Sequence, residues 1–230
     1  MRFGLQKLTL LDYPGVMACT VFTSGCNFRC PFCHNGSLVT GGDAGMPFSR
    51  DELFAFLDSR KKMLDGVCIT GGEPLLHAEL PALIREIKTM GYQVKLDTNG
   101  SFPERLSEIL SSGNVDHVAM DIKHTQEKYP LASGSGTALE AVKKSVELLR
   151  NGKVSFEFRT TVVNGLHTPE DLENIARWIA GVPRYYLQNF TDSGDILLPD
   201  SRFFPVDGEQ LSDMLCRVRK YIPAAEIRGK

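Results

Sequence analysis

The sequence has almost no excess of either charge, and it has no long apolar run. Its 26 Lys and Arg stand against 28 Asp and Glu, a net charge of -2, so no overall positive field would gather a phosphate backbone. No uncharged apolar run approaches the ~18 residues that cross a bilayer, and residues 1–15 contain no apolar core with a cleavage site. We therefore expect a cytoplasmic protein with neither nucleic acid nor a membrane as its partner.

Low-complexity segments and linkers are also lacking. The 230 residues are 42% hydrophobic, a composition that is typical of globular proteins and excludes disorder and collagen. Because α/β barrels use about 200–250 residues for one domain, we expect a single domain over residues 1–230.

Short β-rich runs alternate with helical patterns along the chain. The expected strands are 16–22, 66–70, 93–97, 115–122, 154–163 and 185–190. Helices follow each of them; the first, over 49–64, opens with a capping box of Ser49 and Glu52, and the last is expected at about 207–220.

This alternation predicts the α/β class, with parallel strands joined by right-handed crossovers. Six units are fewer than the eight that close a full barrel, so we expect an incomplete (β/α)6 barrel. A flat, doubly wound sheet is the alternative. In both folds the loops after the strands hold the active site.

Cysteine is scarce, yet half of it is concentrated in one loop. Six cysteines are too few for a disulfide scaffold, but Cys26, Cys30 and Cys33 form C-x3-C-x2-C in the loop over residues 23–36, called here the cysteine loop. Three thiolates would fill three corners of a four-iron cubane and leave the fourth iron open to a ligand. The sequence therefore favours an iron–sulfur cluster.

The sequence disfavours three alternatives to the cluster: a covalently attached haem, a zinc ion and unrelated core cysteines. Cys30-Pro-Phe-Cys33-His34 matches the C-x-x-C-H signature of haem c attachment, but that signature belongs to exported proteins and leaves Cys26 unexplained. A zinc ion would require the adjacent Cys33 and His34 to meet at one point. Unrelated core cysteines are disfavoured because Gly25 and Pro31 mark a loop.

The other cysteines, and the histidines, are expected to have no part in the chemistry. Cys19, Cys68 and Cys216 lie in apolar strands or in a helix, and we expect all three to be buried thiols. No histidine can be paired with a carboxylate from the sequence.

Further motifs give a resemblance to a known family. Thr70-Gly71-Gly72-Glu73-Pro74 follows the second strand, and together with the cysteine motif it resembles the radical S-adenosylmethionine (SAM) superfamily. Asp12-Tyr-Pro-Gly15 in the N-terminal segment 8–15, with Cys33-His34-Asn35, is similar to the glycyl-radical-enzyme activases, most of all those of anaerobic ribonucleoside-triphosphate reductase. The resemblance implies a radical SAM barrel with a [4Fe-4S] cluster on Cys26, Cys30 and Cys33 and with SAM on the open iron.

The resemblance also implies which residues hold SAM. They are Phe32, Cys33, His34, Gly71, Gly72, Glu73, Asp97, Asp121, Lys123, Arg159 and Gln188. Glu73 would neutralise the amino group of SAM, and the two glycines would let the backbone approach the ligand. Phe32 would meet the adenine, or else simply fill the core.

Two carboxylates are expected to face the same cavity, because Asp97 in DTNG and Asp121 in DIK end neighbouring strands. They would repel each other unless positive charge lies nearby. The cofactor and Lys123 would supply such charge, and a monovalent cation held by both carboxylates is a further hypothesis. Arg159 would point into the barrel or lie exposed on a strand face. Gln188 stands at the position where some activases carry a histidine near the ribose of SAM.

The resemblance implies a radical reaction in which the cofactor, and no side chain, carries the reactivity. A flavodoxin or ferredoxin would supply the electron. Cleavage of SAM would give a 5′-deoxyadenosyl radical, which would abstract hydrogen from a glycine of a glycyl-radical enzyme, expected to be anaerobic ribonucleotide reductase. A radical SAM enzyme that modifies a small molecule or a peptide, and an iron–sulfur sensor without enzymatic activity, are the alternative hypotheses.

Overall fold

All strands in the described part of the chain belong to one sheet. The computed structural model describes residues 1–41, 46–198 and 203–229. The strands are β1 (Gly4–Thr9), β2 (Ala18–Thr23), β3 (Gly66–Gly71), β4 (Gln93–Thr98), β5 (His117–Asp121), β6 (Ser155–Val162), β7 (Tyr185–Asn189) and β8 (Glu226–Arg228). The helices are α1 (Gly36–Thr40), α2 (Arg50–Arg60), the 3-10 turn η2 (Pro74–Leu76), α3 (Leu80–Thr89), α4 (Pro103–Ser111), α5 (Tyr129–Ser133), α6 (Ala138–Asn151), α7 (Pro169–Trp178) and α8 (Gly208–Arg219).

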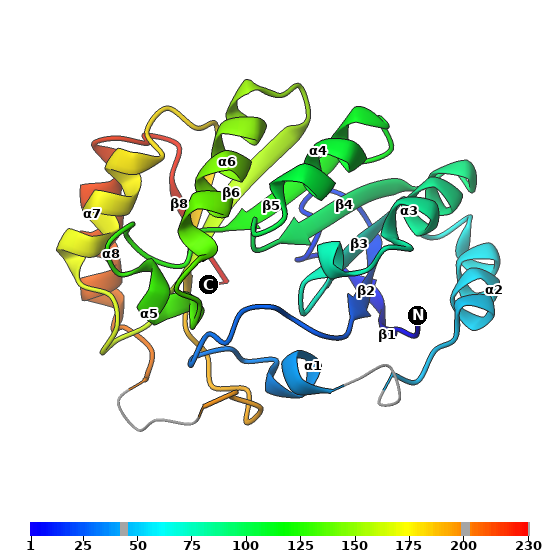
Figure 1. Cartoon of the computed structure of the whole chain (residues 1–230), viewed down its shortest axis with the longest axis horizontal. Coiled ribbons are helices and arrows are strands. Elements are labelled where there is room, and N and C mark those ends of the chain that lie inside the picture. The colour runs from blue at the N-terminus through cyan, green and yellow to red at the C-terminus, as the bar shows by residue number, and fades with distance from the viewer. Residues whose placement is uncertain (42–45, 199–202, 230) are drawn as a thin grey trace.

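The strands follow one another across the sheet in chain order, from β1 to β8. Every neighbouring pair from β2 to β8 is parallel. Right-handed crossovers between adjacent strands place the longer connecting helices on one face, and Figure 1 shows α2, α3, α4, α6, α7 and α8 in an arc around the outer side of a curved sheet, with the short helices α1 and α5 below it. The α/β prediction is therefore confirmed. The doubly wound alternative is wrong, because the strand order never reverses.

The sheet does not close, and it has two strands beyond the six expected. Among the residues that the structure describes, strand β1 pairs only with β2, in the antiparallel sense, and β8 pairs only with β7. Sequence patterns missed both because β1 is an edge strand whose middle residues are exposed, and β8 has only three residues. Neither strand shows the buried pattern of a central parallel strand.

The two faces of the sheet have different side chains, as β4 shows. Successive side chains of a strand point to opposite faces. Val94 and Leu96 are completely buried in the apolar core, each contributing roughly 1.5–3 kcal/mol through burial. Lys95 and Asp97 alternate with them and point to the concave face, where charged groups gather. The helical face thus carries the core, and the concave face carries the candidate site.

No helix in the described ranges is long and apolar enough to cross a bilayer.

Candidate functional site

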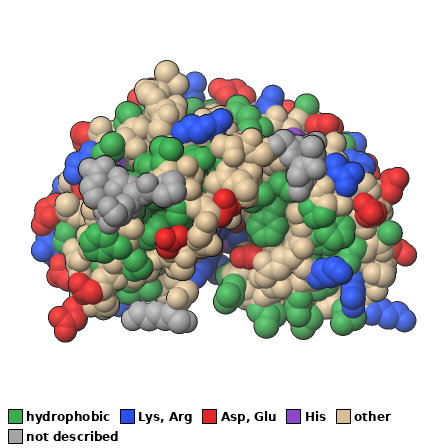
Figure 2. Space-filling model, turned by 90° about the horizontal axis from the view of Figure 1, so that it is seen from below, with side chains coloured by type: hydrophobic (Ala, Val, Ile, Leu, Met, Phe, Trp, Pro, Cys, Tyr) green, Lys and Arg blue, Asp and Glu red, His purple; other side chains and the backbone are tan. Residues whose placement is uncertain are grey.

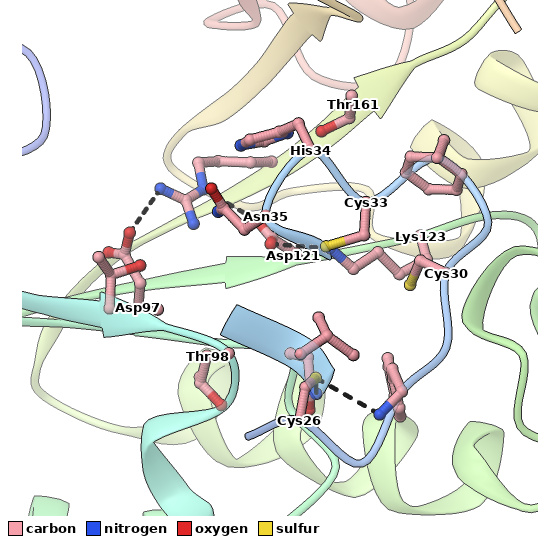
Figure 3. A pocket seen from close by; sticks show the side chains of 18 of the residues that line it. Cys26, Cys30, Cys33, His34, Asn35, Asp97, Thr98, Asp121, Lys123 and Thr161 are labelled. Carbon is pink, nitrogen blue, oxygen red and sulfur yellow. Dashed lines mark hydrogen bonds and ion pairs between the residues drawn. The ribbon is translucent and has the colours of Figure 1, made fainter. Parts of the chain in front are cut away.

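A cavity of about 230 Å³ opens at the carboxyl ends of the strands. One water occupies about 30 Å³ of liquid, so the cavity has room for a ligand of many atoms. It brings together every predicted site residue except Glu73: Cys26, Cys30, Phe32, Cys33, His34, Gly71, Gly72, Asp97, Asp121, Lys123, Arg159 and Gln188. Figure 3 shows Cys30 and Cys33 near Lys123, with Cys26 across the cavity from them.

The cysteine loop is held to the barrel by its own apolar residues and by backbone hydrogen bonds. Phe28 and Cys30 are buried in the core. The amide of Arg29 donates to Ser133 O over 2.8 Å, which joins the loop to α5, and the amide of Cys33 donates to Cys30 O over 3.1 Å in a tight turn. These contacts fix the direction of the thiols.

A second segment, residues 193–198, ties the cysteine loop from its other side. The amide of Leu197 donates to Cys33 O over 2.9 Å, and the amide of Leu198 donates to Pro31 O over 3.2 Å. Asp195 accepts from Ser37 through its carboxylate. This segment lies more than 150 residues from the loop in sequence, so no local pattern predicts the contact.

The thiols need a positive partner to ionise. Burial raises the pKa of Cys30 to about 12 and raises that of Cys26, although the nearby Lys123 ammonium opposes the shift at both. Iron ligation deprotonates a thiol outright. A bound cluster would therefore supply the positive charge that these buried thiolates need.

The arrangement of the cysteines suits a cluster better than a single ion. Within the described part of the chain, no three His, Cys, Asp or Glu side chains are placed to hold one metal ion. Zinc ligands meet at one point, whereas a cubane takes each thiolate on a different iron. Cys26, Cys30 and Cys33 line one cavity without meeting at one point, which fits the three-cysteine cluster and disfavours the zinc alternative.

The guanidinium of Arg159 lies between the two carboxylates. Its Nη1 is 3.0 Å from Asp97 Oδ2, and its Nε is 2.9 Å from Asp121 Oδ1. Burial raises the pKa of both carboxyl groups, but Arg159 and a neighbouring lysine, Lys95 at Asp97 and Lys123 at Asp121, together outweigh burial and lower both pKa values below their usual range. Arg159 thus lies between the two carboxylates, in the place suggested above for a monovalent cation. Its side chain is 11% exposed, so the strand-face alternative for this arginine is wrong.

Two lysines flank this arginine. Lys95, missed as a site residue, is fully buried and pairs with Asp97, and Lys123 Nζ is 2.9 Å from Asp121 Oδ2. Lys95 could have been found from its position two residues before Asp97, because i and i+2 share a face of a strand. These three cations and two carboxylates leave one net positive charge in the cluster.

Glu73 is the predicted site residue that does not line the cavity. It is fully buried, and its carboxylate accepts hydrogen bonds from Leu75 N at 3.0 Å, Thr98 Oγ1 at 2.8 Å and Asn99 N at 2.7 Å. Burial raises its pKa to about 7 against the lowering effect of these bonds. In this structure the carboxylate of Glu73 joins the turn after β3 to the end of β4, and its contact with SAM stays a prediction.

The two glycines before Glu73 are required by chain packing. Gly71 has a φ of 123°, and a Cβ on it would lie 2.2 Å from Thr23 O. A Cβ on Gly72 would lie 1.9 Å from Gly25 O. Glycine therefore allows the cysteine loop to cross the turn after β3, and both residues also line the cavity.

The remaining predicted contacts lie on different sides of the cavity. Phe32 is buried with its ring edge-on to His167 and also lines the cavity, so it fills the core and is available to a ligand. His34 is exposed, and its carbonyl accepts from Ser193 Oγ at 2.7 Å. Gln188 is partly buried on β7.

One expectation about residues outside the cavity is wrong, and one histidine has a carboxylate neighbour there. Cys19 and Cys68 are buried, but Cys216 is exposed because it lies on the outer side of α8. His117 Nε2 is 3.4 Å from Glu157 Oε2, an interaction between strands that no local pattern reveals.

Two stacked histidines join the loops that follow β5 and β6. The rings of His124 and His167 are 4.6 Å apart. His124 Nε2 is 3.1 Å from Leu166 O, and His167 Nε2 is 2.9 Å from Lys123 O. Each Nδ1 accepts a backbone N–H, so each ring is neutral with its proton on Nε2. This pair positions the backbone of Lys123 at the cavity.

Acid is expected to loosen this pair. Burial, helped by the repulsion that a protonated His124 would exert, lowers the pKa of His167 to about 4, whereas an unfolded histidine titrates near 6.5. Between these values only the unfolded chain takes up the proton, so stability falls as pH falls, by about 2 kcal/mol at pH 5 from this group. Urea unfolding at pH 7.5 and pH 5 measures the loss, and His167→Gln should show a correspondingly smaller one. Equal losses in both proteins would contradict the assignment.

Comparison with known proteins places this cavity in a family. Residues 20–179 match the model of the radical SAM superfamily. A protein of Methanocaldococcus jannaschii named "Putative glycyl-radical enzyme activating enzyme MJ1227" is 31% identical over 98% of this chain and 94% of its own length. The pyruvate formate-lyase-activating enzyme of Clostridium pasteurianum is 27% identical over 79% of this chain and 84% of its own.

A solved structure supports the same assignment at the level of the fold. SuiB of Streptococcus suis, in a crystal structure bound to SAM, has a TM-score of 0.70 and 14% identity, over 90% of this chain and 49% of that one. The superfamily uses a [4Fe-4S] cluster and SAM, and the three cysteines of the cavity are those that such a cluster requires. With its curved parallel sheet, its cysteine loop and this match over most of its length, the chain belongs to the radical SAM superfamily.

Proposed function

We propose that the protein is an activase that installs a glycyl radical in a partner enzyme. The observation that carries the proposal is the match, over nearly the whole of both chains, to a relative named as a glycyl-radical enzyme activating enzyme. The shorter match to a pyruvate formate-lyase-activating enzyme points the same way. By the motifs quoted above, we propose anaerobic ribonucleoside-triphosphate reductase as the partner, and a flavodoxin or ferredoxin as electron donor.

The residues of the cavity would serve this reaction by binding, orienting and shielding. Cys26, Cys30 and Cys33 would hold the cluster. Together with SAM, the bound cluster supplies a primary carbon radical that can abstract hydrogen from glycine. Arg159 and Lys123 hold the carboxylate of Asp121 in place through ion pairs. We propose that Asp121 contacts SAM. The buried ring of Phe32 narrows the cavity and excludes water.

A protein substrate needs an opening, and the molecule provides one. Edge strands β1 and β8 leave the sheet unclosed. Figure 2 shows a hollow in the face seen from below, with positively and negatively charged side chains in its depth. A backbone segment could enter an open sheet in this way, whereas a closed barrel would exclude it.

The proposal is tested with the anaerobically reconstituted protein, dithionite and SAM. We expect release of 5′-deoxyadenosine and, once the reductase is added, a glycyl doublet in electron paramagnetic resonance (EPR). A reductase with its radical-site glycine replaced by alanine serves as the control and should give no doublet.

Other outcomes separate the alternatives. The absence of 5′-deoxyadenosine under reducing conditions would favour the nonenzymatic sensor. Release of 5′-deoxyadenosine without a glycyl radical in any candidate partner would favour an enzyme that modifies a small molecule or a peptide.

A further inference from the structure

We propose that Asn99 tunes the reduction potential of the cluster through a hydrogen bond to one of its ligands. Asn99 follows β4 in the turn over 98–101 and lines the cavity. Its Nδ2 lies 3.7 Å from Cys26 Sγ, within reach of an N–H···S hydrogen bond. The inference rests on the cluster, which the superfamily uses, and does not depend on which substrate the protein acts upon.

The direction of the amide group is fixed by its neighbours. Asn99 Oδ1 accepts hydrogen bonds from the backbone amide of Ser101 at 2.9 Å and from its hydroxyl. A flipped amide would turn a donor toward that backbone N–H, so Nδ2 must face the cysteine loop. There its two hydrogens have two acceptors, Cys26 Sγ and Asn27 Oδ1, the latter at 3.1 Å.

The backbone of Asn99 is held as firmly as its side chain. Its N–H donates to the buried carboxylate of Glu73 over 2.7 Å, and the whole residue is 5% exposed. The turn after β3, the end of β4 and the cysteine loop therefore meet at this asparagine. A donor held in this way does not need to reorganise when the charge on the sulfur changes.

A hydrogen bond to a cluster sulfur favours the reduced state. Reduction adds an electron, and part of the added negative charge lies on the cysteine sulfurs, where an N–H dipole stabilises it. Hydrogen bonds to the sulfurs are among the factors that set the potential of iron–sulfur clusters. The bond from Asn99 should therefore raise the potential and make the cluster easier for a donor protein to reduce.

The test is a redox titration of the reconstituted holoprotein, monitored by EPR in the absence of SAM. In Asn99→Leu the side chain keeps a similar size but loses the donor. We expect the equilibrium between oxidised and reduced cluster to shift about tenfold toward the oxidised form, equivalent to a midpoint potential lower by about 59 mV for one electron. Iron content should match that of the unmodified protein.

Asn27→Ala is the matched control. It removes the other acceptor of Nδ2 and a tether of the cysteine loop but leaves the donor to Cys26 in place, so the midpoint should not change. Two results would overturn the proposal: a midpoint in Asn99→Leu equal to that of the unmodified protein, or an equal shift in Asn27→Ala, which would assign the effect to loosening of the loop.

A second variant guards against failure of Asn99→Leu to take up the cluster. Asn99→Asp keeps the shape of the side chain and the acceptor for Ser101 but removes the donor and adds negative charge. We expect a shift in the same direction, of at least the same size. An unchanged or higher midpoint in Asn99→Asp would contradict the proposal.

Discussion

Replacement of Cys30 by alanine is expected to remove the cluster and to abolish cleavage of SAM. Cys30 is the most buried of the three cysteines of the cavity, and its backbone carbonyl closes the turn that carries Cys33. Loss of an outer-shell partner of a metal typically costs 10–100-fold in affinity, so loss of a ligand should cost at least about 100-fold. Iron analysis, the visible absorption of the cluster and 5′-deoxyadenosine release measure the effect.

Two other cysteines provide controls for this experiment. Cys19→Ala shortens a buried side chain on β2, which should lower stability modestly but leave iron content and SAM cleavage intact. Cys216→Ala changes an exposed residue on α8 and should have no effect on either. If Cys30→Ala retained the cluster, or if either control lost it, the ligand assignment would be wrong.

The parts of the fold that the sequence predicts are those that depend on local patterns. Helix α3 buries Leu80, Leu83, Ile84 and Ile87 at the i, i+3, i+4, i+7 spacing of one helix face. The capping box at Ser49 opens α2 as expected. In a parallel sheet the loops that follow the strands all start at the same edge. The alternation of strands and helices is therefore enough to predict that the cysteine loop, Gly72, Asp97 and Asp121 lie at one cavity.

Features that depend on distant contacts could not be predicted in the same way. Arg159 lies 62 residues from Asp97 along the chain, and the pairing of their side chains depends on the register of β4, β5 and β6. Glu73 turns its carboxylate into the interior because Thr98, at the end of β4, and Asn99, directly after it, donate hydrogen bonds to it. In each case the partner of a charged group is set by which strands become neighbours, and nothing in the local sequence specifies it.

Replacement of Arg159 by methionine is expected to cost about 3 kcal/mol of unfolding free energy, the lower end of the range for breaking a buried ion pair. The cost arises because Asp97 and the partly exposed Asp121 lose the cation between them, while Lys95 and Lys123 stay beside them. Arg159 and Asp97 are each 11% exposed, so water replaces little of the charge that Asp97 loses. SAM cleavage should fall as well, since Asp97 and Asp121 would move apart or take up protons. Urea unfolding at pH 7 measures the loss of stability.

An exposed arginine gives the matched control. Arg177 lies 3.4 Å from Glu173 and is 57% exposed, so Arg177→Met should cost far less stability than Arg159→Met. Without Arg159, the pKa values of Asp97 and Asp121 should rise, although the two lysines stay beside them. The unmodified protein loses the stability given by its lowered carboxyl pKa values as pH falls below about 4, so the deficit of Arg159→Met should shrink between about pH 5 and pH 3. Adding Asp97→Asn should recover part of the stability. A loss no larger than that of Arg177→Met, or no recovery in the double variant, would show that Arg159 does not hold the carboxylates together.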